Sequence, residues 1–265
     1  MNKTAQSRGT ESVLNALILA NYDAQDGHLS DDTRSAFDNM WALQQTTGDI
    51  AGSWSWLNFG LEPWEAADSQ YYGASLAAVA IGIAPENYRS SPEIQKNLRL
   101  LRDYLHREYA TQSLINQVGL LWASTKMTGL LDPEEQMSIV KEVLAKQQSD
   151  GGWSLASLSR TWRGWSLRAF ARMWLRSDGT RYNGNSDGYA TGLIILTLQQ
   201  LGIPYDNIQV QKGLFWLKRN QNRPEGRWTC SSLNEQRIPS SNVGRFMSDA
   251  ATAYAVLALA AADGH

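Results

Sequence analysis

Residues 147–153 read Gln147-Gln148-Ser149-Asp150-Gly151-Gly152-Trp153, in which a Gln that ends a helical run is followed by a Gly-Xaa-Trp sequence. The same order recurs at Gln44 with Gly52-Ser53-Trp54, and at Gln221 with Gly226-Arg227-Trp228. A unit that recurs buries its apolar face against its neighbours, so repetition of this kind indicates a repeat architecture. The sequence therefore predicts a helical repeat array.

We call each Gln with its following Gly-Xaa-Trp sequence a corner, and the segments between the corners are of two kinds. One kind is apolar nearly all round, is rich in Ala and Gly, and opens with an acid, which predicts interior helices. These segments begin at Glu11, Asp68, Asp187 and Asp249, and the last two acids share the dipeptide Ser-Asp. The other kind, at residues 92–108 and 133–147, carries one apolar stripe, one charged face and an early Pro, which predicts outer helices.

Alternation of interior and outer helices predicts an all-α fold, an α/α toroid that forms a single domain over residues 1–265. Interior helices are expected near residues 10–22, 67–83, 112–128, 187–202 and 247–262. Outer helices are expected near residues 31–45, 92–108, 133–147 and 207–220, with an additional helix near 163–175. This gives about ten helices, so the ring is expected to be open or incomplete.

Composition narrows the classes of partner. The 265 residues are 43% hydrophobic, which is enough for one large core. A formal net charge of −2 without a basic run argues against nucleic-acid binding. No stretch approaches the roughly 18 apolar residues of a membrane span, and the N-terminus has no apolar run. We therefore expect a soluble, cytoplasmic chain.

Metal and disulfide chemistry are not expected. Cys230 is the single cysteine, so no internal disulfide or thiolate zinc site can form. The histidines, His28, His106 and His265, lie far apart in the sequence and form no ligand pair. We expect neither a metal nor a cofactor.

Eleven tryptophans are the main compositional anomaly. At the corners we expect the ring to pack on a helix end, while the Gln bonds to loose backbone groups. A dense cluster just ahead of Asp68 can instead serve either the core or a ligand, because loops on rigid scaffolds tend to carry function. Its members are Trp54, Trp56, Phe59, Glu62, Trp64 and Glu65.

The corners and the Ala-rich helices resemble the QW repeats of squalene and oxidosqualene cyclases, within the isoprenoid cyclases and protein prenyltransferase β subunits. The resemblance extends from about Ser7 to Ala262. The run Arg245-Phe-Met-Ser-Asp249-Ala-Ala-Thr-Ala looks like the Val-Ser-Asp-Cys-Thr-Ala segment that holds the protonating Asp of oxidosqualene cyclases, with Ala250 in place of the Cys. It implies that Asp249 is the proton donor. The Asp-Xaa-Asp-Asp signature of bacterial squalene cyclases is absent, and the pair Asp31-Asp32 is read as the start of a helix capped by Ser30.

In a toroid the interior helices run parallel, so their leading acids are expected at one rim of the cavity. Each acid can simply interact with its own helix N-terminus, which stabilises by about 0.3 to 1 kcal/mol. Crowding and burial act in the opposite sense and can keep a carboxyl protonated near neutral pH. Both roles remain open for Glu11, Asp68, Asp187 and Asp249.

Two enzyme chemistries fit a protonated carboxyl among aromatic rings. The resemblance implies a class II terpene cyclase, an isomerase or lyase in which Asp249 protonates an alkene or epoxide and aromatic faces stabilise the carbocation. The catalytic candidates are Asp249, Asp187 and Asp68. The substrate-binding candidates are Glu11, Trp54, Trp56, Glu62, Trp64, Glu65, Tyr71, Tyr72, Trp122, Tyr189, Phe246 and Tyr254.

The alternative enzyme is a glycoside hydrolase, in which one carboxylic acid protonates the glycosidic oxygen and a second carboxylate acts as base or nucleophile. Polar loops favour this reading, because a sugar site needs convergent polar groups beside its aromatics. Their polar residues include Asn58, Gln70, Asn183, Asn185, Asn234, Glu235, Gln236 and Arg237. A third reading is a non-catalytic toroid that binds a polyprenyl lipid or a protein through an open edge.

Two further expectations concern surfaces. The basic, aromatic stretch 160–176 places Arg168, Arg172 and Arg176 on one helical face, which suits either peripheral membrane contact or a surface helix that covers the ring. An uncovered apolar ring edge would favour a homodimer. The expected ligand is a small molecule, an isoprenoid or a glycoside.

Overall fold

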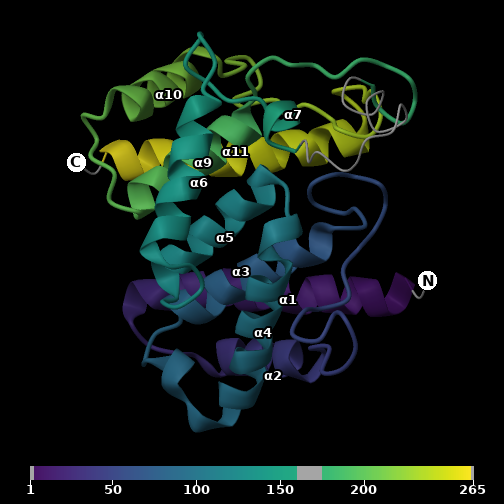
Figure 1. Ribbon diagram of the computed structural model, residues 1–265, viewed down its shortest axis with the longest axis vertical. Coiled ribbons are helices and arrows are strands. Elements are labelled where there is room, and N and C mark those ends of the chain that lie inside the picture. The colour runs from purple at the N-terminus through teal and green to yellow at the C-terminus, as the bar shows by residue number, and fades with distance from the viewer. Residues whose placement is uncertain (1–2, 160–174, 264–265) are drawn as a thin grey trace. The chain divides into compact units, whose positions relative to one another are not determined.

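The computed structural model describes residues 3–159 and 175–263, and the expected helix at 163–175 lies almost wholly outside them. The described chain is all-α, with ten α-helices, three short 3-10 helices and no β-strand in these ranges (Figure 1). The predicted all-α class is confirmed. The chain divides into two compact units, unit 1 with residues 1–112 and 119–133, and unit 2 with residues 113–118 and 134–265.

Unit 1 is built around α1, which packs against α2 and α3, while α3 also packs against α4. Helix α3 is buried on nearly every side, because its residues are small and apolar. Helix α4 instead buries one stripe, which includes Leu98, Leu101 and Leu105. The elements are α1 (Lys3–Asp26), α2 (Asp31–Ala42), α3 (Ser69–Ile83), η1 (Tyr88–Ser90), η2 (Pro92–Ile94), α4 (Gln95–Glu108), η3 (Tyr109–Thr111) and the second half of α5 (Leu114–Lys126).

Unit 2 is centred on α9, which packs most extensively against α11 and also contacts α10 and α7. Like α3, helix α9 is buried from its first turn almost to its end. A Cβ on Gly192 would lie 2.6 Å from the Ala255 nitrogen, so a glycine is needed for α9 and α11 to approach this closely. The elements are the first half of α5, nearly all of α6 (Pro133–Ala145), α7 (Leu155–Leu158), α9 (Gly188–Gln200), α10 (Ile208–Arg219) and α11 (Asn242–Asp263).

The three Trp corners are built alike. In each, the indole N–H donates to the carbonyl of the residue four positions before the corner Gln, in the last turns of the preceding helix. The bond runs from Trp54 to Met40 O (2.6 Å), from Trp153 to Val143 O (2.8 Å) and from Trp228 to Leu217 O (2.8 Å). A buried indole finds a partner in this way, and a carbonyl left free at the helix end is satisfied.

The corner glutamines also play equivalent parts. Each side-chain amide donates to the carbonyl of the Gly two residues before the Trp. Two of them also bond to the next two-faced helix, that is, the next helix with one apolar and one charged face. The distances to the Gly carbonyl are 3.1 Å for Gln44, 2.8 Å for Gln147 and 3.1 Å for Gln221. Gln44 further donates to Asn97 O in α4 (3.0 Å), and Gln147 to Gln209 O in α10 (2.8 Å). The predicted bonding of the Gln to loose backbone groups is confirmed.

The corner glycines have positive φ, with values of 100° at Gly52, 93° at Gly151 and 68° at Gly226. This left-handed backbone turns the chain back onto the helix that has just ended, and a residue with a Cβ adopts it only with strain. The repeat motif therefore needs Gly, Gln and Trp for three separate reasons: the turn, the carbonyl bonds and the buried ring.

Two expected helix starts are wrong. Helix α1 begins at Lys3 and α11 at Asn242, so Glu11 and Asp249 lie about two turns inside their helices and not at the N-terminus. The early part of α1 is held by packing, since a Cβ on Gly9 would lie 2.1 Å from Ser55 O. Only Asp187 caps its helix, whereas Asp68 precedes α3 without a side-chain capping bond.

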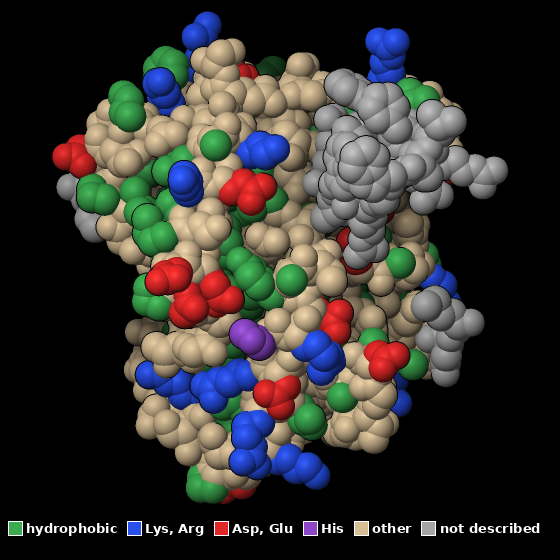
Figure 2. All heavy atoms as spheres, in the orientation of Figure 1, with side chains coloured by type: hydrophobic (Ala, Val, Ile, Leu, Met, Phe, Trp, Pro, Cys, Tyr) green, Lys and Arg blue, Asp and Glu red, His purple; other side chains and the backbone are tan. Residues whose placement is uncertain are grey.

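The predicted start of the helix at Asp31-Asp32 is confirmed, because the Ser30 hydroxyl accepts from the Thr33 N–H of α2 at 3.3 Å. On the face drawn in Figure 2, basic and acidic side chains are interspersed over the described surface. In the described ranges, no helix combines the length and the apolar character needed to cross a bilayer.

Candidate functional site

Unit 2 contains a cavity of about 580 Å³ beside the start of α9. Its described walls come from three segments: residues 176–187, residues 229–239 and residues 244–248 in α11. Most side chains in these walls are polar. A polar cavity of this size fits a small molecule that makes several hydrogen bonds.

The loops that form the wall are tied together by Asp178. One of its carboxylate oxygens accepts from the Thr180 hydroxyl (2.6 Å) and amide (2.9 Å), and the other accepts from the Gln236 N–H (2.6 Å). The Thr180 hydroxyl and these amides hold the pKa of Asp178 at about 2, well below its usual range. Nearby, the Arg176 Nε donates to Ser232 O at 2.8 Å. The two loops are therefore positioned by side chains and not by apolar packing alone.

Asp187 is the acid that lines this cavity. It caps α9, accepting from the Ala190 N–H (3.0 Å) with one oxygen and from the Leu155 N–H (2.6 Å) with the other. Its side chain is 3% exposed, and burial raises its pKa to about 6 against the opposing effect of these amides. Asp187 therefore carries a proton in about one molecule in ten at pH 7, far more often than an ordinary aspartate does.

Cys230 lies next to Asp187 in the same wall. A hydrogen bond between the two side chains lowers the pKa of the Asp187 carboxyl to a smaller extent than burial raises it. Burial and the charge of Asp187 raise the pKa of the Cys230 thiol well above its ordinary value. The thiol is therefore protonated and acts as a donor to Asp187, not as a nucleophile.

A second acid at the same corner behaves in the opposite way. Burial alone would raise the pKa of Asp150, but bonds from the Ser186 hydroxyl (2.7 Å), the Gly152 N–H (3.0 Å) and the Trp216 indole (2.9 Å) bring it below its usual value. Asp150 is thus a structural carboxylate that ties the corner to α10. The contrast shows that the number of donors, set against burial, decides which corner acid keeps its proton.

The structure places Asp249 outside the described cavity wall and exposes its side chain. Two equivalent hydrogen bonds show which residues of α9 and α11 correspond to each other. The Thr191 hydroxyl accepts from the Trp153 N–H (3.0 Å), and the Thr252 hydroxyl accepts from the Trp228 N–H (3.1 Å). Thr191 lies four residues after Asp187, whereas Thr252 lies four residues after Ser248. The structural counterpart of Asp187 is therefore Ser248, and the shared Ser-Asp dipeptides are offset by one residue.

The Trp cluster before α3 is buried in unit 1. Trp54, Trp56 and Trp64 are each at most 5% exposed, and the Trp56 indole donates to Trp64 O at 2.7 Å. The Trp56 ring also meets Tyr72 edge-on, with ring centroids 6.4 Å apart. These contacts agree with the core interpretation of the cluster, and a role in ligand binding stays a prediction.

The remaining predicted residues are divided between the units. In unit 1, Glu11 and Asp68 are exposed, Glu62 and Trp122 are half-buried, Tyr71 is buried, and burial raises the pKa of half-buried Glu65. In unit 2, Tyr189 is buried edge-on against Tyr254 and Phe246 is exposed. The expectation that all four acids share one rim stays a prediction.

Several wall residues escaped the prediction of site residues. Arg176 was predicted on a basic helical face that suits membrane contact or a surface helix, Ser248 entered only as part of the Ser-Asp dipeptide, and Ser232 was not singled out. The sequence signal was the polar character of the loops. Of the polar residues named there, Asn183, Asn185, Gln236 and Arg237 line the described wall, whereas Asn58, Gln70, Asn234 and Glu235 are not among its residues.

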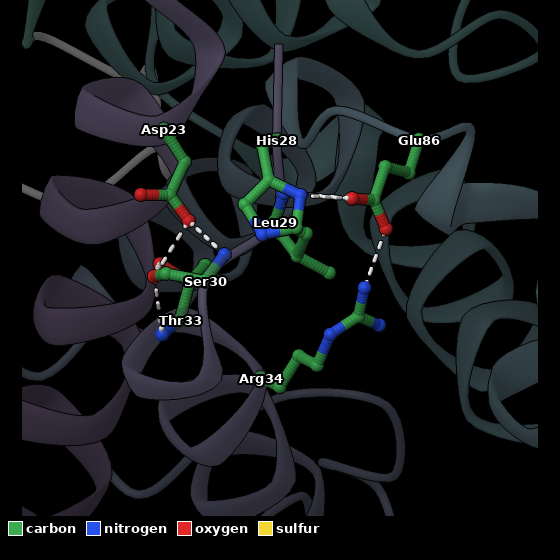
Figure 3. Close-up of polar contacts among 7 residues, drawn as sticks. All are labelled: Asp23, His28, Leu29, Ser30, Thr33, Arg34 and Glu86. Carbon is green, nitrogen blue, oxygen red and sulfur yellow. Dashed lines mark hydrogen bonds and ion pairs between the residues drawn. The ribbon is translucent and has the colours of Figure 1, made fainter. Parts of the chain in front are cut away.

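A separate polar cluster in unit 1 joins the α1–α2 turn to the turn that follows α3 (Figure 3). Glu86 lies 2.7 Å from the His28 ring nitrogen, accepts from the Leu29 N–H at 3.1 Å and pairs with Arg34. The Leu29 amide is the largest cause that lowers the pKa of Glu86. Asp23 accepts from the Ser30 N–H and hydroxyl at 2.7 and 2.8 Å. Because the carboxylates of Glu86 and Asp23 are already used, this cluster is structural.

No protein-family model matches the chain, and no curated protein is matched by its sequence. The QW corners therefore remain a resemblance. In the part of the chain that the structure describes, no group of three His, Cys, Asp or Glu side chains could hold a metal ion.

Proposed function

We propose that the chain is an enzyme of the isoprenoid-cyclase type, in which Asp187 starts the reaction by protonating the substrate. The observation that supports this most directly is the buried Asp187 carboxyl in the wall of a 580 Å³ cavity, with its pKa raised to about 6. A general acid works best when its pKa lies near the operating pH. The reaction is an acid-initiated isomerisation or cyclisation.

The arrangement around Asp187 suits proton donation. When the carboxyl transfers its proton to an epoxide oxygen or an alkene carbon, the carboxylate that forms already accepts from the Ala190 and Leu155 amides. Preorganised donors of this kind stabilise a charge that develops in the transition state without reorganisation. Asp187 therefore replaces Asp249 as the proposed proton donor, because Asp249 is exposed and lies outside the described wall.

We also propose that the hairpins form an α/α toroid. Support comes from the corner glutamines, which connect successive two-faced helices: Gln44 reaches α4 and Gln147 reaches α10. A repeated link of the same geometry turns each hairpin by a similar angle relative to the last, which gives an array with constant curvature.

Glycoside hydrolysis is the second candidate, and the polar wall of the cavity favours it. This chemistry needs two carboxyl groups about 5 to 9.5 Å apart. Asp187 is the one Asp or Glu among the described wall residues. The second carboxylate that hydrolysis needs is thus missing from the described wall. Acid-initiated cyclisation needs only one carboxyl group, because a double bond of the substrate acts as the nucleophile, so hydrolysis ranks second.

The test is a comparison of Asp187→Asn with Asp249→Asn. Purified protein is incubated with squalene, oxidosqualene, shorter polyprenyl alcohols and their phosphates, and chromogenic glycosides, and products are identified by mass spectrometry. We expect a cyclised or isomerised isoprenoid that Asp187→Asn abolishes and Asp249→Asn retains. Loss of the product only in Asp249→Asn, or no conversion of any isoprenoid, would contradict the proposal. Release of an aglycone would establish the second candidate.

A further inference from the structure

Among the described side chains that line the cavity in unit 2, basic groups outnumber acidic ones. Arg176, Arg181 and Arg237 line it, and Asp187 is the one described acid in the wall. Among the described residues, neither Arg176 nor Arg181 forms an ion pair. The guanidinium of Arg176 instead bonds neutral oxygens of Ser232 and Thr180, at 2.8 and 3.2 Å, and the Arg181 carbonyl, and its charge helps to lower the pKa of Asp178.

Two buried donors in the same wall have no hydrogen-bond partner among the described residues. One is the hydroxyl of Ser232, whose residue is 6% exposed, and the other is Nε of Arg237. Arg237 does pair with Glu235, but through Nη1 at 3.0 Å, which leaves Nε unused. Buried polar groups without partners are rare in folded proteins and call for an explanation such as a bound ligand.

Charge and donor geometry together favour one kind of ligand group. A phosphate monoester carries about −1.5 to −2 charges at neutral pH, which suits a wall with three guanidinium groups and one acid, and it offers three acceptor oxygens. A carboxylate carries a single charge and two oxygens. Guanidinium groups bind phosphate with directional, charge-assisted hydrogen bonds, and a serine hydroxyl adds a neutral donor.

We propose that this cavity binds the phosphate group of a phosphorylated substrate, held by Arg176, Arg181 and Arg237 together with the Ser232 hydroxyl. The proposal rests on the proposed function in that it names the polar end of the molecule on which Asp187 acts. The phosphate places the substrate at the polar wall, while Asp187 stands at the start of α9 in the same cavity.

Binding is measured by titration calorimetry at pH 7.5 in the Asp187→Asn background, so that turnover contributes no heat. The probes are geranyl monophosphate, geranic acid, geraniol and inorganic phosphate, together with vesicles that contain phosphatidic acid. The variants are Arg237→Gln, Arg181→Gln and Ser232→Ala, and Arg219→Gln on the exposed surface of α10 is the matched control. Arg181→Gln keeps the test valid if Arg237→Gln does not fold, because the Arg181 side chain is exposed and its loss removes no described contact.

We expect geranyl monophosphate to bind more tightly than geranic acid, and geraniol to bind weakest. Arg237→Gln should weaken binding of the phosphate at least about tenfold, Arg181→Gln and Ser232→Ala by smaller factors, and Arg219→Gln not at all. Binding of inorganic phosphate with the same dependence on these residues would identify a free phosphate as sufficient. Binding to the vesicles with that dependence would identify a lipid headgroup as the source of the phosphate.

Two results would overturn the proposal: equal affinity for geraniol and its phosphate, or unchanged phosphate affinity in both Arg237→Gln and Arg181→Gln. Asp187→Asn separates this inference from the proposed function. If Asp187→Asn loses turnover and still binds the phosphate, both proposals stand. If a neutral isoprenoid is converted in an Asp187-dependent way while no phosphate binds, only the phosphate proposal fails.

Discussion

The corner after α6 and the corner after α2 have the same Trp and Gln hydrogen bonds, but they treat the neighbouring acid differently. At the α6 corner, Asp187 is buried, caps α9 and lines a cavity. At the α2 corner, Asp68 is exposed ahead of α3 and makes no side-chain capping bond. The repeated Gly, Gln and Trp residues thus give both corners the same backbone conformation. The candidate site exists at only one of them, because Asp187 is buried there.

Replacing the corner tryptophans should give the largest loss of stability and tests whether the corners are equivalent. Trp153→Ala should destabilise unit 2 by about 3 to 5 kcal/mol, because it removes a fully buried ring and the bond to Val143 O. Trp54→Ala should cost unit 1 a similar amount, since its ring is equally buried and bonds Met40 O. Urea denaturation, followed by circular dichroism, measures both. A difference of more than about 2 kcal/mol between the two variants would show that the corners are not equivalent.

The difference between the acids predicts a pH effect that belongs to Asp187. Its pKa is about 6 in the folded chain and 3.8 ordinarily, so between these values the folded chain keeps a proton that the unfolded chain has released. Stability therefore falls as the pH rises from about 4 to about 6, by about 3 kcal/mol in total. Asp187→Asn should remove this fall, which denaturation at several pH values measures.

Asp68→Asn is the matched control for that experiment. Its side chain is exposed and caps no amide, so the fall that is due to Asp187 should remain in this variant. The account of the α6 corner is wrong if the fall persists in Asp187→Asn, or if it disappears in Asp68→Asn.

The glycines sharpen the comparison among corners. A Cβ on Gly52 would lie 1.9 Å from Leu100 O, at a φ of 100°, so Gly52→Ala should destabilise by about 2 to 3 kcal/mol. At Gly226, φ is 68° and nothing lies within 4 Å of the added Cβ, so Gly226→Ala should cost only about 1 kcal/mol of backbone strain. Thermal unfolding of the pair gives the comparison, and equal losses would contradict the close approach of α4 to the first corner.

The smallest effect is expected at the glutamines. Gln147→Ala removes bonds to Gly151 O and Gln209 O and should cost about 1 to 2 kcal/mol. Gln221 is half-buried, and its bond to Gly226 O is exposed to solvent, so Gln221→Ala should cost less than about 0.5 kcal/mol. Chemical denaturation measures the free energy of unfolding of both variants. A larger loss in Gln221→Ala than in Gln147→Ala would contradict the view that the bond to the next helix makes Gln147 the more important of the two.

Much of this fold was predictable from local patterns. Periodicity and composition separated the buried helices α3 and α9 from the two-faced α4 and α10, and the Gly-Xaa-Trp sequences located the corners. The start of α1 was not predictable, because Gly9 lowers helix propensity and its packing against Ser55 is a long-range contact. Gly244 likewise lowers helix propensity in the first turn of α11, where an added Cβ would lie 2.3 Å from Ile238 O.

The site was less predictable than the fold. The two Ser-Asp dipeptides look alike in sequence, but Thr191 and Thr252 set a register in which Asp187 corresponds to Ser248. Which acid is buried depends on that register, and on the loops that cover it. Neither leaves a local signal in the sequence.

The most direct test of the central claim is a ¹³C NMR titration of the Asp187 carboxyl, assigned by its absence in Asp187→Asn. The account predicts an apparent pKa near 6, because burial outweighs the amides that cap α9. A carboxyl that titrates near 4 or below would contradict it, since Asp187 would then be an ordinary helix cap without a proton to give at neutral pH.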